Sequence, residues 1–199
     1  MKGIFITIYG INNIGKSTHS RILVERLKKG GYDAVYFKYP IYNLAPTGPK
    51  INKILRSKEP QKIDESELQT LFMQNRLDFE PELKRMLDSG KIVVAEDYSG
   101  TGIAWGTAKG LDQKWVEDLN KDLLKEDFSI MIRGKRDVRM IEINHIHETN
   151  EKLVSKVQII LEQLAAKFGW HIVELREKIT DTAAAIWAEV NAFLAERKK

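Results

Sequence analysis

The stretch YGINNIGKST, residues 9–18, separates two glycines by four residues and follows the second glycine with lysine and serine. It comes directly after the apolar run Ile4–Tyr9 and overlaps the start of Lys16–Lys29, in which apolar residues recur at near-helical spacing. The form Gly-x-x-x-x-Gly-Lys-Ser between a strand and a helix is typical of a loop whose backbone N–H groups wrap a phosphate. We therefore predict a phosphate-binding loop that joins a buried strand to a helix.

Within this loop the residue types have distinct tasks. The ammonium of Lys16 would bridge the β- and γ-phosphate oxygens of ATP, and the hydroxyl of Ser17 would reach a Mg²⁺ ion. The alternative is a glycine turn that merely precedes lysine and serine, and the flanking strand and helix argue against it. The residues predicted to contact ATP are Gly10, Asn13, Ile14, Gly15, Lys16, Ser17 and Thr18.

Composition and charge restrict the possible classes of protein. The 199 residues are 43% hydrophobic, which is enough to bury a core, and the length predicts one domain over residues 1–199. The absence of cysteine excludes disulfides and thiolate metal sites and fits a cytoplasmic protein. The N-terminal apolar run is too short for a membrane span or a signal sequence. The net charge of +4 favours an anionic ligand, but basic and acidic residues are interspersed, which argues against a nucleic-acid partner.

Short apolar runs alternate with longer periodic segments, which predicts an α/β protein with helices on both faces of a parallel sheet. Beyond the first strand, we expect strands at Ala34–Lys38, Lys91–Glu96, Phe128–Ile132 and Trp170–Leu175. Further helices are expected near Lys50–Arg56, Glu65–Asp88, Trp115–Leu124, Glu151–Phe168 and from a cap at Thr180 or Asp181 to about Glu196. Pro81 should kink or divide the longest helix. The pattern as a whole indicates a doubly wound sheet of five strands with about eight helices.

Two acids follow the most continuous apolar run of the chain. KIVVAE, residues 91–96, reads as a central strand buried on both faces, and it ends in Glu96 followed by Asp97. An acid at this place often holds Mg²⁺ in proteins with the phosphate loop described above. We predict that Glu96 or Asp97 holds the metal through water; a solvated strand end is the alternative.

A basic segment follows the strand Phe128–Ile132. No Asn-Lys-x-Asp stretch follows this strand, which argues against a switch GTPase. Instead, residues 133–150 begin with RGKRDVR, and we interpret the segment as a short lid whose guanidinium groups neutralise a transferred phosphoryl group. Arg136 and Arg139 are the candidates for this role, and a solvated basic face is the alternative.

Two further segments, LQTLFMQNR at residues 68–76 and EDYSGTGIAWG at residues 96–106, resemble thymidylate kinases, a family of P-loop nucleoside-monophosphate kinases. The resemblance implies the three-layer α/β/α fold of P-loop NTPases. It also implies that Phe72 stacks on the acceptor base and that Arg76, on the same helix face, donates to a base carbonyl. The resemblance further implies that Tyr98 and Trp105 shape the acceptor site: Tyr98 is in register with the family's Asp-Arg-Tyr segment, and Trp105 falls where the family has an aromatic that packs near the sugar and disfavours a 2′-hydroxyl. Without the resemblance, Phe72 and Trp105 would be assigned to the core.

The chain departs from the family pattern at several acceptor-site positions. Asn12 stands where the family has an acid, and its side chain still allows a hydrogen bond to a sugar hydroxyl. Asp97 and Tyr42 stand where the family has arginines that help to hold the acceptor phosphate. Lys38, or the lid residue Arg136, would have to supply the missing positive charge.

We therefore predict ATP-dependent, Mg²⁺-assisted phosphorylation of a pyrimidine deoxynucleoside monophosphate, with dTMP as the first choice. The acceptor would be bound by Asn12, Lys38, Phe72, Arg76, Tyr98 and Trp105. One alternative is a nucleoside kinase that phosphorylates a 5′-hydroxyl such as that of thymidine, which the two missing arginines favour. Another is a non-catalytic module that binds nucleotides or nucleic acid. The expected partners are small-molecule nucleotides, and a homodimer through Glu65–Leu77 is compatible with the sequence.

Overall fold

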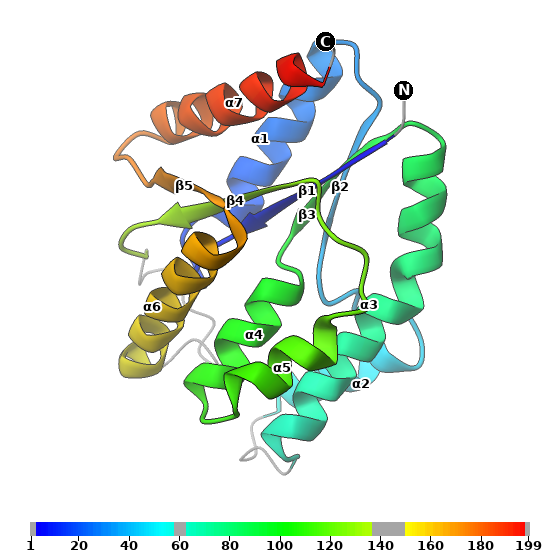
Figure 1. Ribbon diagram of the computed structural model, residues 1–199, viewed down its shortest axis with the longest axis vertical. Coiled ribbons are helices and arrows are strands. Elements are labelled where there is room, and N and C mark those ends of the chain that lie inside the picture. The colour runs from blue at the N-terminus through cyan, green and yellow to red at the C-terminus, as the bar shows by residue number, and fades with distance from the viewer. Residues whose placement is uncertain (1–2, 58–62, 137–149, 198–199) are drawn as a thin grey trace.

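The computed structural model describes residues 3–57, 63–136 and 150–197, and at its centre is a sheet of five parallel strands (Figure 1). The strands are β1 (Ile4–Tyr9), β2 (Ala34–Lys38), β3 (Ile92–Glu96), β4 (Phe128–Arg133) and β5 (His171–Glu174). They lie in the order β2-β3-β1-β4-β5, and every neighbouring pair is parallel. The first strand of the chain is therefore the central one, and the predicted strand number and direction are confirmed.

The register of the central strands determines which loops meet. All residues of β1 and β3 are buried, as expected for parallel strands that are covered on both faces. Ile8 of β1 lies opposite Glu96 of β3 and opposite Ile130 of β4. The loops that follow β1 and β3 consequently emerge side by side at the carboxyl edge of the sheet.

Helices cover both faces of the sheet. They are α1 (Lys16–Lys29), α2 (Thr47–Leu55), α3 (Glu65–Asp88), α4 (Ser99–Ala108), α5 (Gln113–Asn120), α6 (Glu151–Phe168) and α7 (Ile179–Glu196). α1 and α7 pack on one face, whereas α3 and α6 contact the other face with α4 between them (Figure 1). This arrangement is the predicted three-layer α/β/α architecture, with seven helices in the described residues instead of about eight. In that part of the chain, no helix has both the length and the apolar character needed to cross a bilayer.

Helix α4 is an element that periodicity did not indicate. Its sequence SGTGIAWGTA contains three glycines and lacks a polar face. These glycines are explained by close packing, because a Cβ atom on Gly100 would lie 2.3 Å from the ring of Trp170. A Cβ atom on Gly106 would lie 3.2 Å from both Gln69 and Val116. The glycines therefore let α4 approach its neighbours closely.

Pro81 lies inside α3, which continues from Glu65 to Asp88, so the proline does not divide the helix. A proline inside a helix leaves the carbonyl four residues earlier without its backbone partner. Here that carbonyl belongs to Leu77, whose side chain is 43% exposed, so water is available to hydrogen-bond there. Solvent exposure thus explains how the helix continues through the proline.

The start of α7 also differs from the prediction. The helix begins at Ile179, and its N-cap residue is Lys178, with no hydrogen bond from a capping side chain. Neither Thr180 nor Asp181 is the cap. The preceding turn is held in another way, because the backbone N–H of Arg176 donates to the hydroxyl of Thr182 at 2.8 Å.

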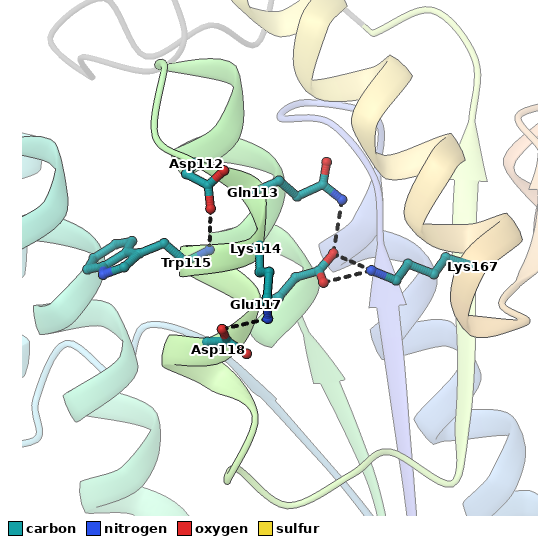
Figure 2. Close-up of polar contacts among 7 residues, drawn as sticks. All are labelled: Asp112, Gln113, Lys114, Trp115, Glu117, Asp118 and Lys167. Carbon is teal, nitrogen blue, oxygen red and sulfur yellow. Dashed lines mark hydrogen bonds and ion pairs between the residues drawn. The ribbon is translucent and has the colours of Figure 1, made fainter.

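Polar contacts fix α5 at its N-terminus and against α6 (Figure 2). Asp112 caps α5 by accepting a hydrogen bond from the backbone N–H of Trp115 at 2.8 Å. Glu117 of α5 accepts from Lys167 of α6 at 2.7 and 2.8 Å and from Gln113 at 2.9 Å. Because α4 packs against both α5 and α6, this link also restrains α4.

Candidate active site

A cavity of about 930 Å³ opens at the carboxyl edge of the sheet. Residues from the loops after all five strands line it, as is general for open parallel sheets. The lining comprises residues 12–19, 38–40, 42, 55, 56, 69, 72, 76, 96, 97, 101, 102, 105, 135, 136, 175–177 and 179. The cavity thus joins the predicted phosphate loop to the predicted acceptor residues on α3 and α4.

The phosphate loop depends on backbone conformations that glycine adopts readily. Gly10 has φ = 148° and Gly15 has φ = 93°, and Asn13 between them has φ = 62°. A Cβ atom on Gly10 would lie 2.9 Å from the carbonyl oxygen of Ile132, so a side chain has no room there. Gly10 does not line the cavity, and it contributes the bend, whereas the residues from Asn12 to Thr18 form the cavity wall.

Lys16 lies at the centre of this loop. Its side chain is 5% exposed, and its ammonium donates to the carbonyl oxygens of Gly10 and Ile11, both at 3.0 Å. The ammonium also lies 3.7 Å from Oδ1 of Asp97. The N-cap residue of α1 is Gly15, which has no capping side chain, so the N–H groups of the first helical turn remain available to an anion.

Tyr9, the residue directly before Gly10, is held in place by contacts with Trp170 and Glu126. Its ring stacks on that of Trp170 with centroids 4.1 Å apart, and its hydroxyl donates to the carboxylate of Glu126. Burial raises the pKa of Glu126 above its ordinary value, although the hydrogen bond from Tyr9 acts in the opposite direction.

Of the two acids predicted to hold the metal, Glu96 makes the closer polar contacts with neighbouring side chains. It is 2% exposed, its Oε1 lies 2.9 Å from Nζ of Lys38, and its Oε2 accepts from the hydroxyl of Tyr36 at 2.6 Å. Burial alone would raise its pKa, but the charges of Lys16 and Lys38 and a hydrogen bond from Ser17 hold that pKa below its ordinary value. Glu96 is therefore an ionised carboxylate in contact with the hydroxyl of Ser17.

Asp97 has a different electrostatic environment. Burial and the neighbouring charge of Glu96 raise its pKa above the ordinary value, and Lys16 offsets this only in part. Its Oδ1 accepts a hydrogen bond from the hydroxyl of Thr101 at 2.8 Å. For Lys38, burial would lower the pKa, but Asp97 and Glu96 raise it above its ordinary value, so this side chain is a cation.

The donor set fits Mg²⁺, which prefers oxygen ligands and keeps several waters. A hydroxyl and one carboxylate beside bound phosphates are sufficient for such an ion, and Ser17 and Glu96 supply this pair. The described ranges contain no group of three or more histidines, cysteines or acids that would indicate a closed metal cage.

The acceptor side of the cavity is formed by side chains of α3 and α4. Phe72 is 9% exposed and packs in a small apolar cluster that includes Leu55 and Leu68. Arg76 is 4% exposed, and its Nη1 lies 3.3 Å from Oδ1 of Asn120. Trp105 of α4 lines the same cavity at 4% exposure. The predicted base-binding pair and the predicted sugar-side aromatic are thus brought together.

Other predicted residues divide into three groups. Asn12, Lys38 and Arg136 line the cavity, and Arg136 forms an ion pair with Glu151 at the start of α6. Tyr98 does not line it. Its ring packs against those of Phe5 and Tyr39 with centroids 5.0 and 5.1 Å apart, so it supports the wall from behind. Arg139 and most of the predicted lid, residues 137–149, lie outside the described residues.

Several lining residues were missed from the sequence. Gln69 lies on the face of α3 that carries Phe72 and Arg76, at a helical spacing that would have identified it. Arg56 stacks over Tyr42 at 5.0 Å, a contact between a loop and the end of a short helix that no local pattern reveals. The residues after β5, including Arg176, could have been found from the rule that ligands bind at the carboxyl ends of parallel strands.

Comparisons with known proteins agree with this geometry. The family model "Thymidylate kinase" matches residues 8–186. A probable thymidylate kinase of Thermococcus onnurineus is 36% identical over 137 residues, covering 64% of this chain and 65% of the relative. A probable thymidylate kinase of Thermococcus kodakarensis is 32% identical over 207 residues, covering 96% of this chain and 99% of the relative.

A solved structure shows the same fold. The thymidylate kinase of Candida albicans aligns with a TM-score of 0.81 at 21% identity, covering 96% of this chain and 92% of that chain. The predicted P-loop NTPase fold is thereby confirmed. Because the family model spans most of the chain and a relative 32% identical spans nearly all of it, the chain belongs to the thymidylate kinase family of nucleoside-monophosphate kinases, which are phosphotransferases.

Proposed function

We propose that this protein transfers the γ-phosphoryl group of ATP to dTMP, yielding ADP and dTDP. The observation that supports this most directly is the single cavity lined by the phosphate loop together with Phe72, Arg76 and Trp105. Phosphoryl transfer requires donor and acceptor to be held together with water excluded, and one continuous cavity provides this arrangement. Family membership does not favour the two alternatives, a nucleoside kinase and a non-catalytic module.

On the donor side, backbone N–H groups of the loop and the ammonium of Lys16 would bind the β- and γ-phosphates. Arg136, at the edge of the cavity, and Arg139 would neutralise the equatorial oxygens of the moving phosphoryl group. Loss of the ion pair with Glu151 would free a guanidinium nitrogen of Arg136 for this task.

For the metal, we propose Mg²⁺ held by Ser17 and Glu96. When bound, Mg²⁺ neutralises charge on the β- and γ-phosphate oxygens. Glu96 is the better candidate for a direct or water-mediated ligand because its pKa is lowered, whereas that of Asp97 is raised. Asp97, beside Lys16, would act through water and by positioning that ammonium.

On the acceptor side, the ring of Phe72 would stack on thymine and the guanidinium of Arg76 would donate to it. Asn12 would bond the sugar hydroxyl, and Trp105 would pack against the deoxyribose. No general base is needed, because the acceptor phosphate is already ionised near neutral pH.

Lys38 is our candidate for holding the acceptor phosphate. Its side chain is 46% exposed at the cavity edge, and its pKa is raised, so it presents a cation there. An arriving phosphate would compete with Glu96 for this ammonium. We also propose a cytoplasmic location, where both substrates are available, and a homodimer through α3, on which Leu77 is 43% exposed.

The decisive test compares dTMP and thymidine as acceptors with ATP and Mg²⁺, measuring ADP release and the phosphorylated product. We expect one ADP for each dTDP formed and no turnover of thymidine. Phosphorylation of thymidine without phosphorylation of dTMP would replace this proposal with the nucleoside-kinase alternative. Nucleic-acid affinity with a steep salt dependence, and no transfer to any acceptor, would favour the non-catalytic module.

A further inference from the structure

Gln69 has a buried hydrogen-bonding group for which the described residues supply no partner. The side chain is 1% exposed and lines the cavity, one turn before Phe72 and two turns before Arg76 on α3. In the part of the chain that the structure describes, its carbonyl oxygen Oε1 is buried without a hydrogen-bond partner. A buried amide oxygen in this condition destabilises the protein unless a ligand satisfies it.

The orientation of the Gln69 amide is fixed by its neighbours. Its Nε2 donates to Oε1 of Glu65 at 2.8 Å, and Oε2 of Glu65 accepts from Nζ of Lys109 at 2.7 Å. A carboxylate held by a lysine accepts hydrogen bonds only, so the NH₂ group of Gln69 must face Glu65. The amide therefore directs its acceptor oxygen, and not a donor, away from Glu65.

That oxygen and the guanidinium of Arg76 converge on Gly102, which also lines the cavity. A Cβ atom on Gly102 would lie 3.2 Å from Oε1 of Gln69, and 3.1 and 3.2 Å from Nη2 and Nη1 of Arg76. One acceptor and one donor thus lie next to each other beside Gly102, where a side chain would crowd both of them. Such a pair suits a planar group that presents a donor beside an acceptor.

The six-membered ring of thymine or uracil has this pattern, with the N3–H donor beside the O4 acceptor. Cytosine has the reverse pattern, with the N3 acceptor beside the N4 amino donor. We propose that Gln69 accepts a hydrogen bond from N3–H of the acceptor base while Arg76 donates to O4, so that the site selects thymine and uracil over cytosine. The inference deepens the proposed function and rests on it. Glu65 and Lys109 are positioning residues in this scheme.

The test is a comparison of dTMP, dUMP and dCMP as acceptors for the wild-type chain and the Gln69→Leu variant. We expect kcat/KM for dTMP and dUMP to fall about ten- to hundredfold in the variant, mainly through KM, while the value for dCMP changes little. The matched control is Gln74→Leu, on the same helix, where Nε2 contacts only Asp78 in the described structure and the residue does not line the cavity. This control should keep the wild-type preference.

A merely structural role for Gln69 would lower activity with all three acceptors in equal proportion, and that result overturns the inference. A wild-type chain that uses dTMP and dCMP equally also overturns it, while leaving phosphorylation of a monophosphate intact. Should the wild type phosphorylate none of them, the proposed function fails; calorimetric binding of dTMP and dCMP to both chains then decides. If the wild type then binds dTMP more tightly than dCMP and Gln69→Leu abolishes this preference, the inference is supported. If the wild type shows no such preference, the inference is contradicted.

The relay from Lys109 provides a second measurement. Lys109→Met should release Glu65 and allow the Gln69 amide to turn, which reduces the dTMP preference about threefold, without changing the KM for ATP. If neither Lys109→Met nor Gln69→Leu changes the preference for dTMP over dCMP, the scheme is rejected.

Discussion

The two halves of the cavity would recognise their proposed ligands by different means. The donor half is formed by consecutive residues, and its key groups are backbone N–H groups presented by a bend at Gly10 and Gly15. The acceptor half is formed by side chains on two helices, α3 and α4, which meet only through tertiary packing. Backbone recognition tolerates changes of side chain, whereas side-chain recognition does not. The donor half therefore depends mainly on the bend that its glycines allow, whereas the acceptor half depends on the identity of side chains such as Phe72 and Arg76.

The largest expected effect is on Lys16, a donor-side residue that acts through its side chain. Lys16→Met should lower kcat by about 10²–10³-fold, because a preorganised cation at the moving phosphoryl group is lost. Steady-state kinetics with ATP and dTMP measure it. Lys28→Met, on the same helix and 52% exposed, is the control and should behave as the wild type. Near-normal activity in Lys16→Met would refute the assignment of the donor half.

An intermediate effect is expected at the acceptor half. Arg76→Lys should raise the KM for dTMP about tenfold and leave the KM for ATP unchanged, because an ammonium cannot reproduce a forked donor that also contacts Asn120. Arg85→Lys, an exposed change on the same helix, is the matched control. A rise in both KM values would mean that the two halves are not independent.

The smallest effect concerns Glu126 beneath the donor loop. Because the native-state pKa of Glu126 is raised above 4.5, its contribution to stability is present below that pH and is lost as pH rises through the native pKa. Glu126→Gln, which still accepts from Tyr9, should therefore gain stability relative to the wild type as pH rises, by about 1 kcal/mol at most. Thermal unfolding of both chains between pH 4.5 and 8 measures the difference. A gap that stays constant with pH would contradict the raised pKa.

Much of the fold could be predicted because local signals agreed with the tertiary structure. β1, α1 and α3 have the predicted bounds, since a continuous apolar run, a glycine turn and helical periodicity coincide there. α4 could not be found in this way, because its glycines serve contacts with Trp170 and Gln69 that only the folded chain reveals. The continuity of α3 through Pro81 could not be read from the local sequence, because a proline at that place is equally compatible with the end of a helix.

The site residues can be divided in the same way, into those that local sequence signals indicate and those that only the tertiary structure reveals. The phosphate loop could be predicted from adjacent residues, and Phe72 and Arg76 from spacing on one helix together with the family resemblance. Helical spacing could have placed Gln69 on the face of Phe72 and Arg76, but only the folded structure reveals that its carbonyl oxygen is buried without a partner among the described residues. The position of Tyr98 behind the wall likewise depends on packing against Tyr39, which no spacing reveals.

The place of Trp105 in the cavity wall has a practical consequence. Of the four tryptophans, Trp105 lines the cavity at 4% exposure, whereas Trp115 is 40% exposed on α5 and Trp170 is stacked on Tyr9. Indole emission is sensitive to the polarity of its surroundings, so the chain carries its own optical reporter beside the proposed sugar subsite. Replacing the other three indoles with phenylalanine would leave one emitter, with which occupancy could be followed in an unlabelled enzyme.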